Sequence, residues 1–368
     1  MQKQTLFLVT SLSLWAGIAA TMPSVTSANQ PPLSSKQPTN LKLNNLLWEG
    51  SKRVKAGDIA GALDIYQQAA KLDKDNPRIF SAIGYLHTLK GSFAESIAAY
   101  KGAIALEPNN ADFHYALAYS LANLGDNSGA ATAYRRSIEL NPKNAQAYLG
   151  LGAVMRRMKN NDVAINAYNS AIALDEKNAQ AYELLGAIYL DQQIHGQALQ
   201  TLQQALQLNP NSSSINFKLG TAWFRQGNIN AAIALFQRAA QLEPKNPKIF
   251  LELGKAMQAR KNLDGAIDAF KQATTLQPNS ADVQTALAET FMLKGDYKQA
   301  TLSYKRLIEI TPQNPQAYYK LASALKKENR QSEAIAALEK ARDLYRSQGQ
   351  SEGVQKAESA LRELKPSS

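Results

Sequence analysis

The sequence repeats itself with a period of 34 residues. From Leu43 to Gln348 it divides into nine consecutive blocks of this length without insertion, which begin at residues 43, 77, 111, 145, 179, 213, 247, 281 and 315. A unit this short cannot bury a core of its own and is stable only when it stacks on its neighbours. We therefore expect one repeat array, although 368 residues would otherwise suggest two or three separate domains.

Small and large residues recur at fixed positions within each block. Position 8 is Gly or Ala in every block, and position 20 is Ala or Ser. Position 24 is always large: Tyr66, Tyr100, Tyr134, Tyr168, Leu202, Phe236, Phe270, Tyr304 and Leu338. Spacings of three, four and seven residues put side chains on one face of a helix, so each block is predicted to form two amphipathic helices. The small residues let the two backbones approach closely, and the large residue fills the remaining space.

The ends of the blocks carry the residues that begin and end helices. Position 34 is Asn or Ser in eight blocks, and these side chains cap helix N-termini. Pro77, Pro247 and Pro315 follow at the first helical position, where proline is tolerated. Glycine is predicted to form the turn between the two helices at Gly57, Gly91, Gly125, Gly227 and Gly295.

This pattern resembles the tetratricopeptide repeat family over residues 43–348. The resemblance implies an all-α, right-handed superhelical solenoid of about nine helix-turn-helix repeats. Residues 349–368 are predicted to form a capping helix and tail, because Val354, Ala357, Leu361 and Leu364 lie on one helical stripe. Such a stripe would close the open end of the solenoid and leave a polar face in solvent.

The N-terminus is predicted to be a targeting segment. Lys3 precedes an apolar run from Leu6 to Ala20, and a polar stretch follows, so residues 1–28 are typical of a secretory signal peptide. The alternative is an uncleaved anchor in which residues 6–22 tether the chain to a membrane, although the apolar run is shorter than the ~20 residues that span a bilayer. Either interpretation predicts export, to the periplasm or the thylakoid lumen. Residues 29–42 are predicted to be a flexible linker.

No motif in the sequence points to catalysis. The chain has no cysteine, and its three histidines, His87, His114 and His195, form no pair at the four-residue spacing of a helical metal site. The phosphate-binding glycine loops and the nucleophile elbow of hydrolases are also missing. We therefore expect no enzyme activity, no metal and no cofactor.

The resemblance implies that partners bind on the concave face, at positions 2, 5, 9, 12 and 13 of each first helix. The candidate groove residues are Tyr85, Tyr115, Tyr119, Arg156, Arg157, Phe217, Phe224, Arg225, Lys248 and Lys255. Aromatic and arginine side chains dominate binding hot spots. The expected function is a non-catalytic scaffold or assembly factor outside the cytoplasm that binds protein or peptide partners.

Charge leaves one alternative function open. The formal net charge is +11, but it is distributed along the chain with no run of five like charges, so nucleic acid is not an expected partner. The alternative is a basic groove that binds an anionic cell-envelope polymer or polysaccharide through long-range attraction. The sequence predicts neither the identity of the partner nor the oligomeric state.

Overall fold

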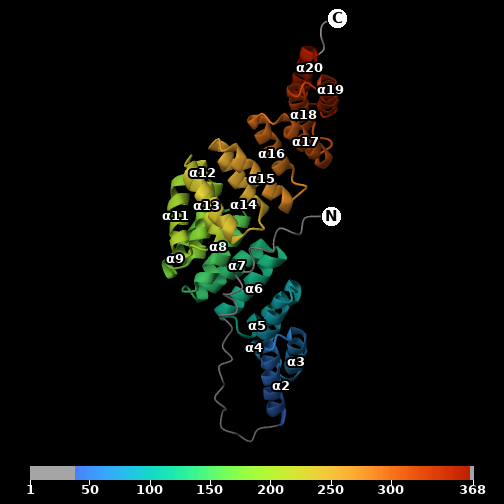
Figure 1. Ribbon diagram of the computed structural model, residues 1–368. Coiled ribbons are helices and arrows are strands. Elements are labelled where there is room, and N and C mark those ends of the chain that lie inside the picture. The colour runs from blue at the N-terminus through green and yellow to red at the C-terminus, as the bar shows by residue number, and fades with distance from the viewer. Residues whose placement is uncertain (1–37, 365–368) are drawn as a thin grey trace. The chain divides into compact units, whose positions relative to one another are not determined.

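The computed structural model describes residues 38–364, and all the regular structure in this range is helical (Figure 1). The predicted signal peptide, residues 1–28, lies outside this range. The predicted linker needs a correction, because the first helix begins at Pro38, inside residues 29–42. Proline is well suited to the first turn of a helix, and the apolar residues that follow continue the helical stripe. The rest of that linker lies outside the described residues.

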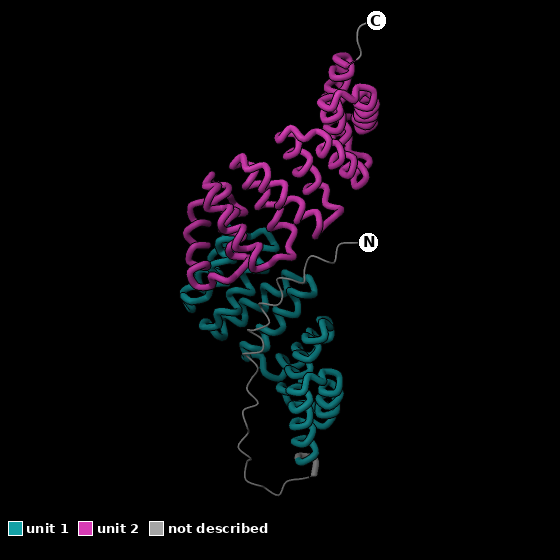
Figure 2. Tube along the Cα trace, viewed as in Figure 1, with its two compact units in different colours: residues 1–188 teal, residues 189–368 magenta. Residues whose placement is uncertain are grey.

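The chain divides into two compact units, residues 1–188 and 189–368 (Figure 2). The described helices of the first unit are α2 (Pro38–Lys55), α3 (Ile59–Leu72), α4 (Pro77–Leu89), α5 (Phe93–Leu106), α6 (Ala111–Leu124), α7 (Asn127–Leu140), α8 (Ala145–Arg157) and α9 (Asn161–Leu174). Helix α10 (Ala179–Asp191) contains the boundary between the units.

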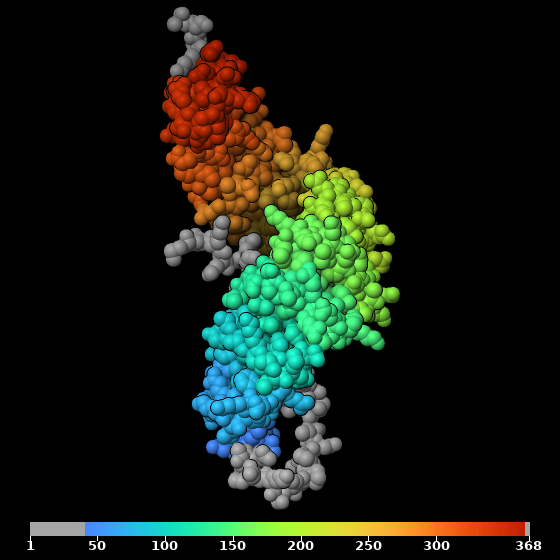
Figure 3. Space-filling model, turned by 180° about the vertical axis from the view of Figure 1, so that it is seen from behind, coloured from blue at the N-terminus to red at the C-terminus, as the bar shows by residue number. Residues whose placement is uncertain are grey.

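The second unit continues the same series. Its helices are α11 (His195–Leu208), α12 (Ser213–Arg225), α13 (Ile229–Leu242), α14 (Pro247–Ala259), α15 (Leu263–Leu276), α16 (Ala281–Lys294), α17 (Tyr297–Ile310), α18 (Pro315–Lys327), α19 (Gln331–Ser347) and α20 (Ser351–Leu364). Within each unit, each helix packs against the next one in the chain, and consecutive repeats form consecutive bands of the surface (Figure 3). The prediction of an all-helical repeat fold is confirmed.

The small residue at position 8 and the large residue at position 24 of one block are in contact. A Cβ atom added at Gly152 would lie 2.5 Å from Cε1 of Tyr168, and one added at Gly254 would lie 2.4 Å from Cε1 of Phe270. Both rings are fully buried. The aromatic side chain of the second helix thus lies directly on the backbone of the first, which explains why only glycine or alanine occurs at position 8.

The turn between the two helices of a block has one conformation in all nine blocks. The five glycines predicted at this turn all have positive φ, for example 96° at Gly125. In the other four blocks a non-glycine residue has φ between 60° and 66°: Lys159, Gln193, Lys261 and Asn329. The left-handed backbone that ends the first helix is therefore a property of the repeat, and glycine is only the residue that adopts it with least strain.

Candidate partner-binding surface

The ten candidate groove residues lie on first helices, as their positions in the repeat require, but they divide equally between the two units. The first unit holds Tyr85 on α4, Tyr115 and Tyr119 on α6, and Arg156 and Arg157 on α8. The second unit holds Phe217, Phe224 and Arg225 on α12, and Lys248 and Lys255 on α14. Each group is therefore a separate candidate surface.

Two of the candidates are core residues. Tyr115 is 2% exposed and Tyr119 is 4% exposed. The ring of Tyr115 packs edge-on against Tyr134, with 5.8 Å between ring centroids, and Tyr134 in turn reaches over the bare backbone of Gly150. Burial raises the pKa of both Tyr115 and Tyr134. The structure corrects the sequence interpretation here, because these tyrosines leave almost no surface for a partner.

Arg157 and Arg225 link first helices of consecutive repeats. Nη1 of Arg157 donates to the carbonyl oxygen of Ala122 at 3.0 Å, and Nη1 of Arg225 donates to that of Leu190 at 2.9 Å. Both carbonyls lie in the last turn of a helix, where the backbone carries partial negative charge. Each arginine thus satisfies a helix end 35 residues earlier in the chain. Arg157 thus connects α8 with the last turn of α6, and Arg225 connects α12 with the last turn of α10.

The remaining first-unit candidates are half-buried. Tyr85 lies on α4, and burial raises its pKa. Arg156 lies near Tyr168, whose pKa burial raises to about 12 while Arg156 and Arg157 oppose the shift. Half-buried aromatic and guanidinium groups on one unit can contribute to a binding surface, but two members of this group, Tyr115 and Tyr119, are buried and add almost nothing to it.

In the second unit, four candidates lie on the first helices of two adjacent repeats, α12 and α14. Phe217 and Phe224 are half-buried and pack on the core around Phe236, with 5.6 Å between the ring centroids of Phe217 and Phe236. Nζ of Lys248 lies 5.3 Å from the ring centroid of Phe217, within the range of a cation–π contact. Lys255 forms an ion pair of 2.8 Å with Glu252. We call Phe217, Phe224, Lys248 and Lys255 the α12–α14 patch.

The sequence analysis missed a polar contact that recurs between blocks. In three places an arginine at position 26 donates to an asparagine at position 33 of the preceding block: Arg136 to Asn109 at 3.0 Å, Arg238 to Asn211 at 2.7 Å, and Arg306 to Asn279 at 2.8 Å. Arginine and asparagine at a constant separation of 27 residues were the available signal. These contacts connect a second helix with the preceding inter-repeat turn, so they stabilise the stacking of repeats.

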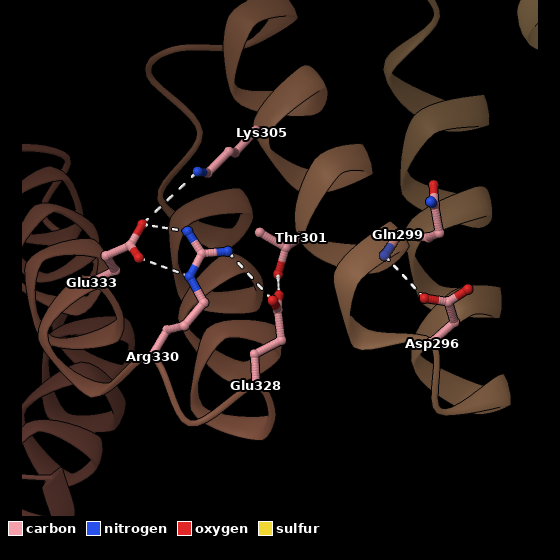
Figure 4. A network of polar contacts seen from close by, with 7 residues as sticks. All are labelled: Asp296, Gln299, Thr301, Lys305, Glu328, Arg330 and Glu333. Atoms are coloured by element: carbon pink, nitrogen blue, oxygen red, sulfur yellow. Dashed lines mark hydrogen bonds and ion pairs between the residues drawn. The ribbon is translucent and has the colours of Figure 1, made fainter.

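A larger polar network joins α17, α18 and α19 (Figure 4). Arg330 donates to both carboxylate oxygens of Glu333 at 2.7 Å and to Glu328 at 3.3 Å. The hydroxyl of Thr301, which is 2% exposed, donates to the other oxygen of Glu328. The hydrogen bond from Arg330 lowers the pKa of Glu333. The network supplies hydrogen-bond donors to the carboxylate of Glu328 near the core, so we interpret it as a structural contact.

The described residues offer no site for a metal. Among residues 38–364, no group of three or more His, Asp or Glu side chains is arranged to hold a metal ion. Likewise, none of the helices between α2 and α20 is long and apolar enough to cross a membrane.

Two family models match the sequence. The model of the cilia and flagella-associated protein 70 C-terminal domain, which consists of tetratricopeptide repeats, matches residues 14–286. The chain belongs to the tetratricopeptide repeat family. The tetratricopeptide repeat domain of cytochrome c-type biogenesis protein H matches residues 243–352. Families of this repeat are generally non-catalytic scaffolds that bind other proteins. A search of the curated proteins found no match.

Solved structures of tetratricopeptide repeat proteins share the fold. A chain of the APC/C hetero-tetramer Cut9–Hcn1 is 23% identical with a TM-score of 0.51; the alignment covers 76% of this chain and 55% of that one, so this chain spans about half the length of that relative. The C-terminal part of a repeat protein from Cytophaga hutchinsonii is 16% identical with a TM-score of 0.55, over 65% and 98% of the two chains. A protein from Parabacteroides merdae is 16% identical with a TM-score of 0.53, over 68% and 99%.

Proposed function

We propose that this tetratricopeptide repeat protein is an exported scaffold that holds a protein partner on the α12–α14 patch and performs no catalysis itself. The observation that carries the proposal is the patch, where the exposed Lys248 lies over the half-buried ring of Phe217 and a second half-buried phenylalanine, Phe224, packs on the same core. Aromatic side chains that are already packed on one face lose little conformational freedom when a partner covers the other face. This arrangement is typical of a binding hot spot.

The chemistry of the patch defines the partner segment. Phe217 and Phe224 offer apolar area, and Lys248 adds a positive charge above one ring. A segment with an apolar side chain next to a carboxylate would fill both requirements. Lys255 is already paired with Glu252, so it adds less to the attraction than Lys248.

An assembly role outside the cytoplasm is the form of scaffold that we favour. The N-terminal sequence is typical of an export signal, and one of the two matching families is named for cytochrome c-type biogenesis. Cut9, which shares this fold, was crystallised as a hetero-tetramer with Hcn1. Fractionation of the native cells with N-terminal sequencing of the recovered chain tests the location. Recovery of an unprocessed chain in the cytosol would contradict it.

The binding test compares two variants of equal charge change. Phe224→Ala with Lys248→Glu removes an apolar contact and reverses the charge of the patch. The matched control is Lys271→Glu, an exposed lysine on α15 outside the patch. In affinity capture from the native envelope fraction, we expect the patch variant to lose a retained protein by on the order of 30-fold, as removal of a hot spot does, and the control to retain it.

A salt series separates this function from the polymer alternative. Binding to an anionic polysaccharide should fall steeply between low and high salt, because it depends on charge alone. Protein binding on the α12–α14 patch should fall only modestly, because Phe217 and Phe224 provide apolar contacts that salt does not screen. Retention of polymer only, with equal loss for Lys271→Glu and the patch variant, would replace the proposed function.

A further inference from the structure

Helix α2 exposes two large apolar side chains that the first repeat leaves uncovered. Leu41 is 62% exposed and Trp48 is 65% exposed. Seven residues, about two helical turns, separate them, so they lie on one side of α2 about 10 Å apart along its axis. A different side of the helix packs against the core of the first repeat through Leu43, Leu46 and Leu47. The helix thus has one apolar face in the core and a second one in solvent.

Positive charge surrounds the second apolar face. Lys42, Lys52 and Lys55 are exposed, and Nζ of Lys52 lies 5.1 Å from the ring centroid of Trp48. Within residues 38–364, no carboxylate forms an ion pair with any of these three lysines. The acids nearest in sequence to Lys52 and Lys55, Glu49 and Asp58, are both bound to Arg53, at 3.0 and 2.9 Å. The repeat therefore leaves the positive charge of this face unneutralised.

We propose that α2 docks on the surface of an anionic lipid bilayer. Trp48 and Leu41 would enter the headgroup region, where the amphipathic indole ring is favoured, and the three lysines would lie against lipid phosphates. Each lysine at such a surface strengthens binding by about fivefold. This surface is separate from the α12–α14 patch, so the proposal does not depend on the proposed function.

The shape of the face favours a bilayer over a protein partner. A tryptophan that anchors a protein complex usually fits a well-packed pocket at the centre of the interface. A cleft includes Leu41 of this face, together with Lys42, Asn45, Leu46 and Glu49, but Trp48 lies outside it. Trp48 instead projects from a convex helix with a lysine over its ring, which is the arrangement of an interfacial anchor.

The fluorescence of Trp48 tests the proposal directly. The chain has three tryptophans, so Trp15→Phe with Trp223→Phe in the full chain leaves Trp48 as the only reporter. Vesicles of phosphatidylcholine with added phosphatidylglycerol should shift its emission to shorter wavelength and protect it from acrylamide. Vesicles of phosphatidylcholine alone should have a much smaller effect. Emission from Trp48 reports contact at α2 even if residues 6–22 also bind lipid.

Two further variants control the measurement. Leu302 on α17 is 59% exposed, so Leu302→Trp in a chain with Trp15, Trp48 and Trp223 all changed to Phe places a reporter at a comparable exposed position in the other unit. Its emission should not respond to vesicles. Lys42→Gln, Lys52→Gln and Lys55→Gln together should weaken the response of Trp48 by roughly 100-fold in lipid concentration, about fivefold for each lysine.

Three results would overturn the proposal. The first is an unchanged Trp48 spectrum while the chain sediments with anionic vesicles. The second is an equal response from Trp48 and from the tryptophan at position 302. The third is a Trp48 spectrum that shifts with protein concentration in the absence of lipid, which would assign the face to a second copy of the chain.

Discussion

Helices α2 and α20 are the first and the last helices of the described chain, and within residues 38–364 each has a neighbouring helix on one side only. They treat the exposed side in opposite ways. Helix α2 leaves Leu41 and Trp48 largely in solvent. The exposed residues of α20 are all polar: Ser351, Glu352, Gln355, Lys356, Ser359, Arg362 and Glu363. A polar outer face lets a repeat array end without attracting another molecule, and α20 has such a face whereas α2 does not.

The two helices also differ in how they are attached. Ala357, Leu361 and Leu364 of α20 are buried, as the capping stripe in the sequence predicted. Polar contacts at its rim connect it with earlier helices: Lys326 with Glu363 at 3.0 Å, Arg346 with Glu358 at 3.1 Å, and the side-chain amide of Gln331 with the carbonyl oxygen of Leu364 at 2.5 Å. In the first repeat, Arg53 forms ion pairs with Glu49 and Asp58, which belong to the same repeat. Comparable sequence positions therefore serve closure at one end and, as we propose, docking at the other.

The largest difference is expected for deletion of an apolar side chain. Leu361 is 6% exposed, so Leu361→Ala should destabilise the helices around it by about 2–5 kcal/mol. Leu41→Ala removes a side chain that is mostly in solvent and should change stability by less than about 0.5 kcal/mol. Hydrogen exchange of the amides in α18 to α20 and in α2 and α3 measures the two effects locally, which suits an array that need not unfold in one step. Equal effects would refute the contrast between the two helices.

A second test adds a methyl group at each end. A Cβ atom at Gly353 would lie 2.3 Å from Cδ1 of the buried Tyr345, whereas one at Gly50 would lie 2.9 Å from Cε2 of Tyr66. Overpacking typically destabilises by about 1–3 kcal/mol, and alanine recovers up to about 1 kcal/mol of helix propensity. Gly353→Ala should therefore lower the thermal unfolding temperature, and Gly50→Ala should lower it less. The reverse order would show that Tyr345 yields more easily than Tyr66.

The repeat pattern predicted the packing that these tests examine, but not every consequence of it. Position 8 and position 24 are adjacent in space because i, i+4 and i+7 periodicity places both on inner faces, so Gly152 and Tyr168 could be paired from sequence alone. The burial of Tyr115 could not, because it depends on a glycine in the following block that lets Tyr134 extend over the backbone. A helical position specifies a face, whereas burial depends on the side chains that surround it.

The arginines show the same limit. Position 13 was predicted to face a partner, and Arg157 and Arg225 instead donate to carbonyls of earlier first helices. Such a bond requires an open helix end within reach of a long side chain, which a single block does not reveal. Phe217 and Lys248 of the α12–α14 patch could be selected from the sequence, because they lie at positions 5 and 2 of adjacent blocks, two of the positions expected to face a partner.

Tyr66 in the first repeat and Tyr345 near the other end are expected to respond differently to replacement by phenylalanine. Burial raises the pKa of both Tyr66 and Tyr345. The folded chain thus retains a phenolic proton that the unfolded chain releases above pH ~10, so stability present below that pH is lost as pH rises. Tyr345 also donates to Gln316, so Tyr345→Phe should destabilise by about 0.5–1.5 kcal/mol at neutral pH.

Tyr66→Phe provides the comparison at the other end. It should leave neutral stability nearly unchanged and reduce the loss of stability above pH ~10. Urea unfolding at neutral and alkaline pH measures both properties for each variant. A neutral-pH loss for Tyr66→Phe as large as that for Tyr345→Phe would remove this difference between the ends.

The smallest effect is expected for the ion pair that joins α20 to α19. Arg346 is exposed and Glu358 is partly exposed, so a double-mutant cycle with Arg346→Ala and Glu358→Ala should give a coupling of about 0.2–1 kcal/mol that declines with added salt. Salt should act far more strongly on α2, because Lys42, Lys52 and Lys55 have no carboxylate partner in the described chain and would bind lipid phosphates across a screened surface. Measured together, a salt series on α20 stability and on vesicle binding by Trp48 should show a slight slope for the first and a steep one for the second. If both slopes are slight, the lysines of α2 contribute little to docking, and the exposed apolar face must be covered through Leu41 and Trp48 alone.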